Sequence, residues 1–227
     1  MRWVALALLL GLIAWTGARQ DAAAFDSETI IHKSALPQPR SGRVTMPIHG
    51  LTNAPPGYVD FCRRQADECR SQSTVRRASG GAGRLDLTAD RWIMLNAVNS
   101  YINDTVAPKT DRELYGVEEY WTMPDSAGDC EDYVLLKRRE LIKRGWPESA
   151  LLITVVLDEQ GDGHAVLTVR TAQGDFVLDN KHSRILLWRD VPYTFIKRQS
   201  YRSPQLWVSL TPRLGRGSVA AANAELR

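Results

Sequence analysis

The chain has 227 residues, of which 44% are hydrophobic and 24% are charged, and these fractions exclude a wholly disordered or fibrous protein. Its formal net charge is only +3, from 29 basic and 26 acidic residues, so composition gives no reason to expect a nucleic-acid partner. Three cysteines are too few for a disulfide scaffold or a cysteine-rich zinc module.

The N-terminus is typical of a secretory signal peptide. An uncharged, mostly apolar run from Val4 to Trp15 is shorter than the roughly 20 residues that a membrane-spanning helix needs. Ala22 and Ala24 then offer a cleavage site of the A-x-A kind. We expect residues 1–24 to be removed, which leaves a mature protein outside the cytoplasm with no stable membrane insertion. The alternative is an uncleaved membrane anchor.

A loop-rich lead separates this peptide from the rest of the chain. Residues 25–59 hold five prolines and little periodicity. Cys62 and Cys69 follow, and in an oxidising compartment we expect them to form a disulfide. Cys130 is then left over, either as an inert buried residue or as a reactive thiol.

Two helices are predicted in the middle of the chain. Apolar residues recur at helical spacing between Thr88 and Val106, with Thr88 as the N-cap. The second helix runs from Asp129 to Lys143, with Asp129 as its cap and charges ordered as the helix dipole favours, and Gly145 ends it. The first helix has a polar face that is either solvated or directed into a site: Asn96, Asn99 and Asn103.

From Ala150 onward the pattern changes to short strands. The runs LLITVVL, HAVLTVRT and FVLDN are separated by polar turns, and ILLW, YTFIKRQ and LWVSL can add further strands. Consecutive strands joined by short turns predict an antiparallel sheet. Helices followed by strands predict an α+β fold rather than a doubly wound one. We expect residues 211–227 to be a disordered tail.

Cys130 stands at the first turn of the second helix, where backbone N–H groups stabilise a thiolate. A nucleophile also needs a base and a group that orients the base. His164 opens a strand after a glycine turn, and Asp179 ends the next strand, so the sequence offers a Cys–His–Asp arrangement. If Gln173–Gly174 is a two-residue turn, Asp179 falls four residues from His164, or roughly 13 Å along a strand. The arrangement then requires a wider turn, a bulge or a staggered hairpin, or Asn180 orients the imidazole instead.

Carboxylates crowd the thiol. Asp129, Glu131 and Asp132 carry negative charge that opposes ionisation of Cys130. They either cap the helix and face water, or they bind a cation. Oxygen ligands select a hard ion, and calcium is available outside the cytoplasm, although the spacing is not that of an EF-hand.

Three motifs resemble the bacterial transglutaminase-like cysteine proteinases: GDCEDYVLLKRRELIKRGWP, GHAVLTVRT and FVLDN, with Tyr120–Trp121 upstream. The resemblance covers roughly residues 60–210. It implies a papain- or transglutaminase-like α+β domain in which the nucleophile helix packs on an antiparallel sheet. It also implies that Cys130 is the nucleophile, His164 the base and Asp179 the orienting carboxylate.

The family includes periplasmic LapG-type proteases, whose acidic residues beside the cysteine bind calcium; the matching positions are Asp129 and Glu131. Those members cleave a large surface adhesin and are restrained by an inner-membrane cyclic-di-GMP receptor. The sequence departs from them in the short stretch TMPDSAGD before the cysteine and in its Cys62/Cys69 lead.

The resemblance therefore implies a periplasmic cysteine peptidase that hydrolyses a peptide bond in a cell-envelope or surface protein through a thioester. Two alternatives remain at this point. The same residues can support a protein-glutamine transglutaminase or amidase, in which an amine rather than water intercepts the thioester. A non-catalytic periplasmic binding protein on the same fold is the other.

Overall fold

The computed structural model describes residue 36 and residues 44–70 and 84–212. The expected signal peptide, about half of the lead and nearly all of the expected tail lie outside these residues. Within the described residues, no helix is both long enough and apolar enough to cross a membrane. The expected lead contributes regular structure near its end, because β1 (Leu51–Thr52) and the start of α2 (Pro56–Arg64) fall before residue 60.

Both predicted helices are present. The first is α4 (Ala89–Thr105), and the Thr88 side chain caps it by accepting a hydrogen bond from the backbone N–H of Arg91 at 3.3 Å. The second is α6 (Cys130–Lys143), which ends at Gly145 with a positive φ of 85° that suits glycine. Three shorter helices, α2, α3 (Ala66–Cys69) and α5 (Asp111–Tyr115), were not predicted from the sequence.

The strands form one antiparallel sheet in the order β1-β9-β8-β4-β5-β6-β7, which confirms the α+β prediction. A small parallel pair, β2 with β3, lies apart from it. The remaining bounds are β2 (Ala107–Pro108), β3 (Ala127–Gly128), β4 (Leu151–Leu157), β5 (Gly163–Thr171), β6 (Gly174–Leu178), β7 (Leu186–Leu187), β8 (Thr194–Ser200) and β9 (Ser203–Ser209), with 3-10 turns at Glu148–Ala150 and Trp188–Asp190.

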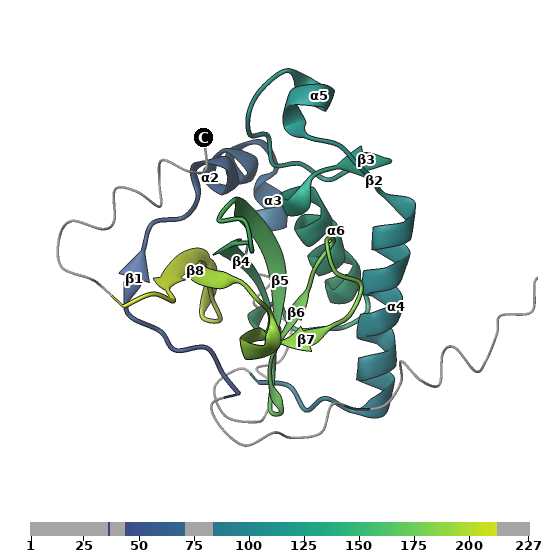
Figure 1. Cartoon of the computed structure of the whole chain (residues 1–227), viewed down its shortest axis with the longest axis vertical. Helices are drawn as coiled ribbons and strands as arrows, with labels where there is room; N and C mark the ends of the chain where they lie inside the picture. Colours follow the sequence, from purple (N-terminus) through teal and green to yellow (C-terminus); the bar gives the residue numbers. More distant parts are fainter. Residues whose placement is uncertain (1–35, 37–43, 71–83, 213–227) are drawn as a thin grey trace, which may run out of the picture.

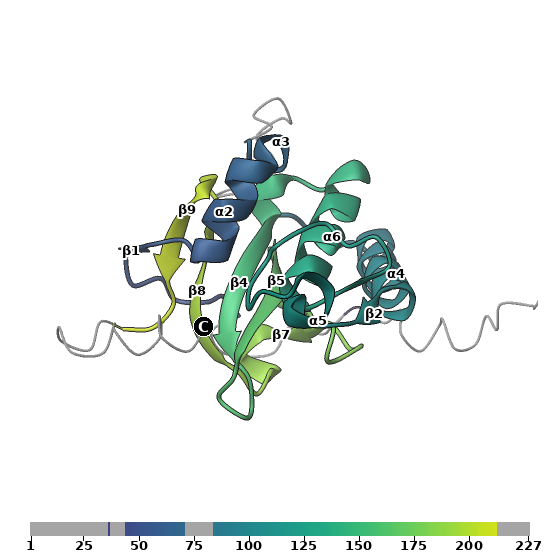
Figure 2. The same ribbon diagram turned by 90° about the horizontal axis from the view of Figure 1, so that it is seen from above.

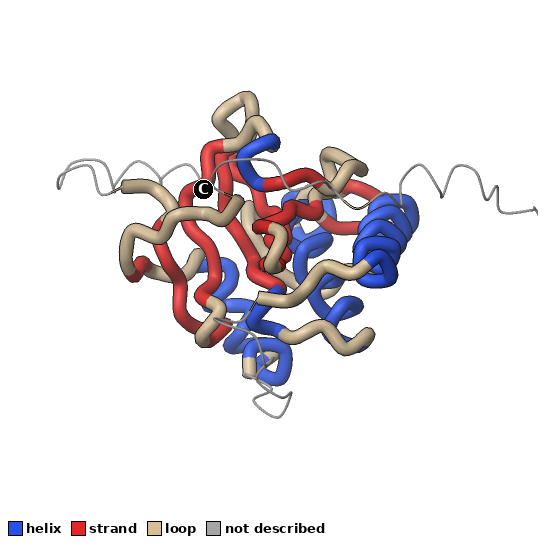
Figure 3. The backbone as a smooth tube through the Cα atoms, turned by 90° about the horizontal axis from the view of Figure 1, so that it is seen from below, coloured by secondary structure: helices blue, strands red, loops and turns tan. Residues whose placement is uncertain are grey.

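The long helices cover one face of this sheet (Figures 1 and 3). The larger apolar core lies between these helices and the sheet. Side chains of α2, α4 and α6 pack there against alternate residues of β4, β5 and β6. In Figure 2, α2, α6 and α4 lie along the same side of the strands. A smaller cluster on the opposite face is built around Val156, Val166 and Val177, with Tyr193 among its members. Because α6 packs on β5 and β4, the N-terminal end of the nucleophile helix is fixed relative to the strands.

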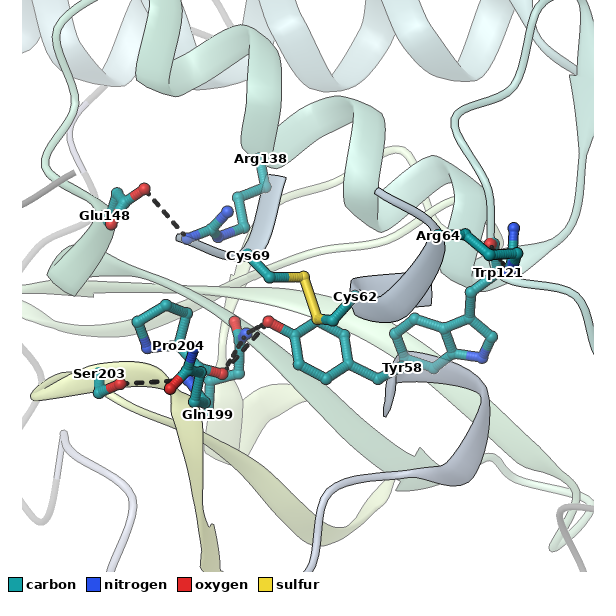
Figure 4. Close-up of a disulfide and its surroundings, with 11 residues drawn as sticks. Tyr58, Cys62, Arg64, Cys69, Trp121, Arg138, Glu148, Gln199, Ser203 and Pro204 are labelled. Carbon is teal, nitrogen blue, oxygen red and sulfur yellow. Dashed lines mark hydrogen bonds and ion pairs between the residues drawn. A yellow bond between two sulfur atoms is a disulfide. The ribbon is translucent and has the colours of Figure 1, made fainter. Parts of the chain in front are cut away.

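The disulfide between Cys62 and Cys69 is present and joins α2 to α3 (Figure 4). It closes a loop with a sequence separation of 7, which in the chain-entropy model stabilises the fold by about 2.5 kcal/mol. Tyr58 of α2 accepts a hydrogen bond from Gln199 Nε2 at 2.8 Å, and Arg139 of α6 binds Glu68 of α3. The disulfide-linked helices therefore brace α6 against the β8–β9 end of the sheet.

Candidate active site

Cys130 is the first residue of α6 and is partly buried, as expected for a thiol at a helix N-terminus. The residue before it, Asp129, occupies the N-cap position, but its side chain makes no capping hydrogen bond. Its carboxylate instead accepts the backbone N–H of Asp111, at the start of α5, at 3.3 Å. The predicted capping role of Asp129 is therefore wrong, because a tertiary partner takes the carboxylate away from its own helix.

Steric crowding explains why the first residue of the GDCED motif is a glycine. Gly128 ends β3, and a Cβ atom there would lie 2.5 Å from Asp132 Oδ2. Asp132 is fully buried and accepts the backbone N–H of Thr122 through Oδ1 at 2.8 Å. The motif thus packs the loop before Cys130 closely against the first turn of α6.

His164 and Asp179 meet directly. His164 Nε2 and Asp179 Oδ1 lie 2.8 Å apart, and the two residues are 2% and 3% exposed. The β5–β6 hairpin turns at Ala172–Gln173, because Thr171 pairs with Gly174 and Leu167 with Leu178. This turn lies one residue earlier than Gln173–Gly174 and shifts the register by two residues. Asp179 then falls diagonally across from His164 without a wider turn or a bulge in this hairpin.

Three further groups hold Asp179, and sequence reasoning assigned none of them to it. Tyr193 donates its hydroxyl to Asp179 Oδ2 at 2.6 Å, and the backbone N–H of Lys181 donates to Oδ1 at 3.1 Å. Asn103 of α4 donates to the Asp179 carbonyl at 2.8 Å, while Asn99 donates to Ser183 at 3.1 Å. Two of the three asparagines on α4 therefore bind the segment after β6, as the second interpretation of that polar face required. Nothing local in the sequence marks Tyr193.

The thiol does not stand in an electropositive environment. Its sulfur donates to Glu131 Oε2 at 3.1 Å. Burial, together with the Glu131 and Asp129 carboxylates, raises the pKa of Cys130, and a hydrogen bond from the Ala165 backbone opposes this only partly. The Ala165 contact places the sulfur beside the residue that follows His164. The helix N-terminus by itself is therefore not enough to make the sulfur anionic.

The carboxylates gather into a cluster that extends beyond the two expected residues. Ligand-capable oxygens of Asp111, Asp129 and Glu131 all lie within 4.8 Å of one another. Burial raises the pKa of Asp111 to about 6 and that of Asp132 to about 8. Asp111 was missed because it lies 18 residues before Asp129, on a separate short helix.

A comparison with family models decides which family this is. Residues 48–214 match the model of the bacterial transglutaminase-like cysteine proteinases, BTLCP. The chain belongs to this family. It is accordingly a cysteine protease that acts on a protein substrate, and the α+β fold expected from the resemblance is confirmed.

Solved structures of LapG from Legionella pneumophila are similar to this proteinase. The calcium-bound form is 26% identical, covers 60% of this chain and 80% of its own, and has a TM-score of 0.46. The EGTA-treated form is 25% identical, covers 60% and 78% of the two chains, and has a TM-score of 0.45. No curated protein matches the sequence.

A buried lysine lies two turns along the nucleophile helix of the proteinase. Lys137 is fully buried, and its Nζ has no hydrogen-bond partner among the described residues. It lies 5.8 Å from the centre of the Tyr133 ring, and Asp179 is the charged group that acts on it. Burial lowers the pKa of Lys137 to about 7, so the charged form is costly inside the fold.

We therefore expect Lys137→Met to raise the melting temperature. Replacing a buried charge by an apolar residue of similar volume stabilises by on the order of 1–4 kcal/mol, and 1 kcal/mol moves Tm by roughly 2–4 °C at this size. Above pH 7 the unfolded chain holds the lysine proton and the native one does not, so native stability rises with pH. The gain from Lys137→Met should therefore shrink between pH 7 and 10. Calorimetry at several pH values measures it, with the exposed Lys143→Met as control. An unchanged or lower Tm at pH 7 would contradict the expectation.

Proposed function

We propose that the protein is a periplasmic cysteine peptidase that hydrolyses a peptide bond in a cell-envelope or surface protein. Cys130 is its nucleophile, His164 its general base and Asp179 the carboxylate that orients the imidazole. The observation that carries this proposal is the 2.8 Å contact between His164 and Asp179, at the end of the strand beside which the Cys130 sulfur lies.

The proposed reaction is acyl transfer to sulfur and then to water. Because Nε2 of His164 is bound to Asp179, Nδ1 is the nitrogen left to take the Cys130 proton. The sulfur attacks the substrate carbonyl, and the backbone N–H of Cys130, one of the unpaired donors at the start of α6, binds the oxyanion. The imidazolium protonates the leaving amine. His164 then takes a proton from water, which hydrolyses the thioester and releases the acid.

Export and partners belong to the same proposal. The N-terminal apolar run and the A-x-A site support secretion. The resemblance to periplasmic LapG-type proteases supports a surface adhesin as the substrate and an inner-membrane receptor as a regulator. A disulfide between Cys62 and Cys69 is consistent with an oxidising compartment.

We also propose that Asp111, Asp129 and Glu131 bind calcium. The residues fit such an ion: their donors are all oxygens, and Asp111 Oδ1 and Asp129 Oδ1 are buried with no hydrogen-bond partner in the part of the chain that the structure describes. When bound, calcium supplies positive charge that offsets the carboxylates facing the Cys130 sulfur. Asp111, at the start of α5, would hold this ion together with the two residues expected beside the cysteine.

Comparative proteomics of cell-envelope fractions from wild type and a Cys130→Ala strain tests the proposed function. We expect one envelope protein to be shortened only when the thiol is present, while purified Cys130→Ala keeps the wild-type Tm. A product of higher mass would indicate crosslinking instead of hydrolysis. An envelope proteome that is identical in the two strains would favour a non-catalytic binding protein.

A second measurement addresses the nucleophile without a substrate. Cys130 is the one cysteine outside the disulfide, so iodoacetamide labelling followed by intact-mass measurement reports on it alone. With calcium present, labelling by this reagent should be fast in wild type and slow in His164→Ala. Equal rates would contradict the role of His164 as base.

A further inference from the structure

Two loops flank the His164–Asp179 pair. The turn at residues 158–162 leads into β5 and His164, and residues 180–185 follow Asp179 out of β6. Asp158 organises the first loop: its Oδ1 accepts the backbone N–H groups of Gln160 at 3.0 Å and Asp162 at 2.9 Å. Its side chain is only 1% exposed, so water reaches its charge poorly and a cationic partner stabilises it.

Lys181 supplies that partner and joins the two loops. Its Nζ donates to Asp158 Oδ2, the carboxylate oxygen that the two N–H groups of the turn do not bind. Its own backbone N–H donates to Asp179 Oδ1, which is also the oxygen that contacts His164. A second contact joins the same two loops, because His182 Nε2 and Glu159 Oε1 lie 3.2 Å apart.

We propose that Lys181 is a positioning residue of this peptidase: by binding Asp158, it clamps the loop that leads to His164 onto the loop that holds Asp179. The proposal rests on the proposed roles of His164 and Asp179. Lys181 does not contact substrate in this assignment. It acts through those two side chains, and its ammonium also interacts electrostatically with Cys130.

The clamp has a specific consequence for Asp179. The N–H of Lys181 reaches Asp179 Oδ1 only when residues 179–181 hold their turn, a geometry typical of an aspartate that binds the backbone two residues ahead. Without the ammonium, Asp158 Oδ2 loses the cation that links it to residues 180–185, while Oδ1 keeps only its two bonds within the turn, so the two loops can separate. The imidazole then loses a fixed acceptor, and misplacement of about 1 Å at a reacting group can cost 10²-fold in rate.

The test compares Lys181→Met with Lys181→Arg in the full mature chain with calcium present. Methionine keeps the apolar stem and the backbone N–H but removes the charge, whereas arginine restores a cation that can reach Asp158. We expect iodoacetamide to label Cys130 at least tenfold more slowly in Lys181→Met, and Lys181→Arg to recover most of the wild-type rate. Lys143→Met breaks an exposed ion pair near the end of α6 and serves as the matched control with an unchanged rate.

NMR of protein labelled with ¹⁵N-histidine gives a direct readout of position. The imidazole N–H signal assigned to His164, by its loss in His164→Gln, should be sharp in wild type and in Lys181→Arg. In Lys181→Met it should broaden and exchange with water at least tenfold faster. Asp158→Asn should behave like Lys181→Met, and the double variant should be no worse than the single ones, because both changes break one contact.

The outcomes separate this inference from the proposed function. A sharp His164 signal in Lys181→Met would overturn the clamp, whatever happens to Tm or to the labelling rate, because loss of an ammonium that interacts with Cys130 can slow labelling by itself. Cys130 and His164 would keep their roles. A labelling rate that does not depend on His164 would instead contradict the proposed function, irrespective of Lys181. If Lys181→Met fails to fold, Asp158→Asn gives the same test, since it keeps the size and the turn-capping oxygen of Asp158.

Discussion

Asp179→Ala is expected to lower kcat/KM for the cleaved envelope protein by about 10⁴-fold, the scale measured for removal of an orienting carboxylate in a hydrolase triad. Alanine removes both oxygens, so His164 Nε2 and the Tyr193 hydroxyl each lose an acceptor within a buried site. The imidazole can then rotate away from the thiol, and the imidazolium formed during attack has no counter-charge.

Asp179→Asn should lose less activity than Asp179→Ala. The amide oxygen can still accept from His164 Nε2 and the Lys181 N–H, while the amide nitrogen faces the hydroxyl of Tyr193, which can accept. Asparagine therefore keeps the orientation and loses the charge. Asp104→Ala, on the exposed side of α4, is the matched control with unchanged cleavage. Cleavage by Asp179→Ala within tenfold of wild type would mean that another acceptor, such as Asn180, orients the imidazole.

The features that could be predicted from the sequence are those fixed by local chemistry. Thr88 caps α4 because a threonine oxygen reaches the N–H three residues ahead, and Gly145 ends α6 because glycine adopts a positive φ at low cost. The β-hairpins could be predicted because short polar turns separate the apolar runs that form the strands. Even so, the β5–β6 register depended on which two residues form the turn, and choosing one residue too late displaced Asp179 by two positions.

The features that escaped prediction depend on tertiary contacts. Asp111 joins the acidic cluster only because β2 pairs with β3 and brings α5 to the start of α6. The same contact explains why Asp129 does not cap its helix. Tyr193 reaches Asp179 from the smaller apolar cluster on the face of the sheet opposite the helices, and no local pattern distinguishes it from a core tyrosine.

Removal of calcium is expected to produce the second large effect. A bound ion at 100 times its Kd stabilises the fold by about 2.7 kcal/mol, so EGTA should lower Tm by roughly 5–10 °C. The carboxylates explain why: Asp111 and Glu131 are buried and lie within 4.8 Å of Asp129, and burial together with the charge of Asp129 raises the pKa of both. Magnesium, which requires stricter octahedral geometry, should restore little of the loss and is the control ion.

Two single substitutions test whether calcium binding controls the reactivity of the Cys130 thiol. Asp111→Asn removes a ligand that does not touch Cys130, so it should weaken the calcium-induced rise in Tm while leaving labelling in EGTA unchanged. Glu131→Gln removes the carboxylate 3.1 Å from the sulfur, so it should speed iodoacetamide labelling in EGTA by at least about tenfold and abolish the response to calcium.

A protein whose Tm and labelling rate are the same in calcium and in EGTA would rule out the metal site. If Glu131→Gln changed the Tm response but not the labelling rate, the ion would stabilise the loop before Cys130 without controlling its charge.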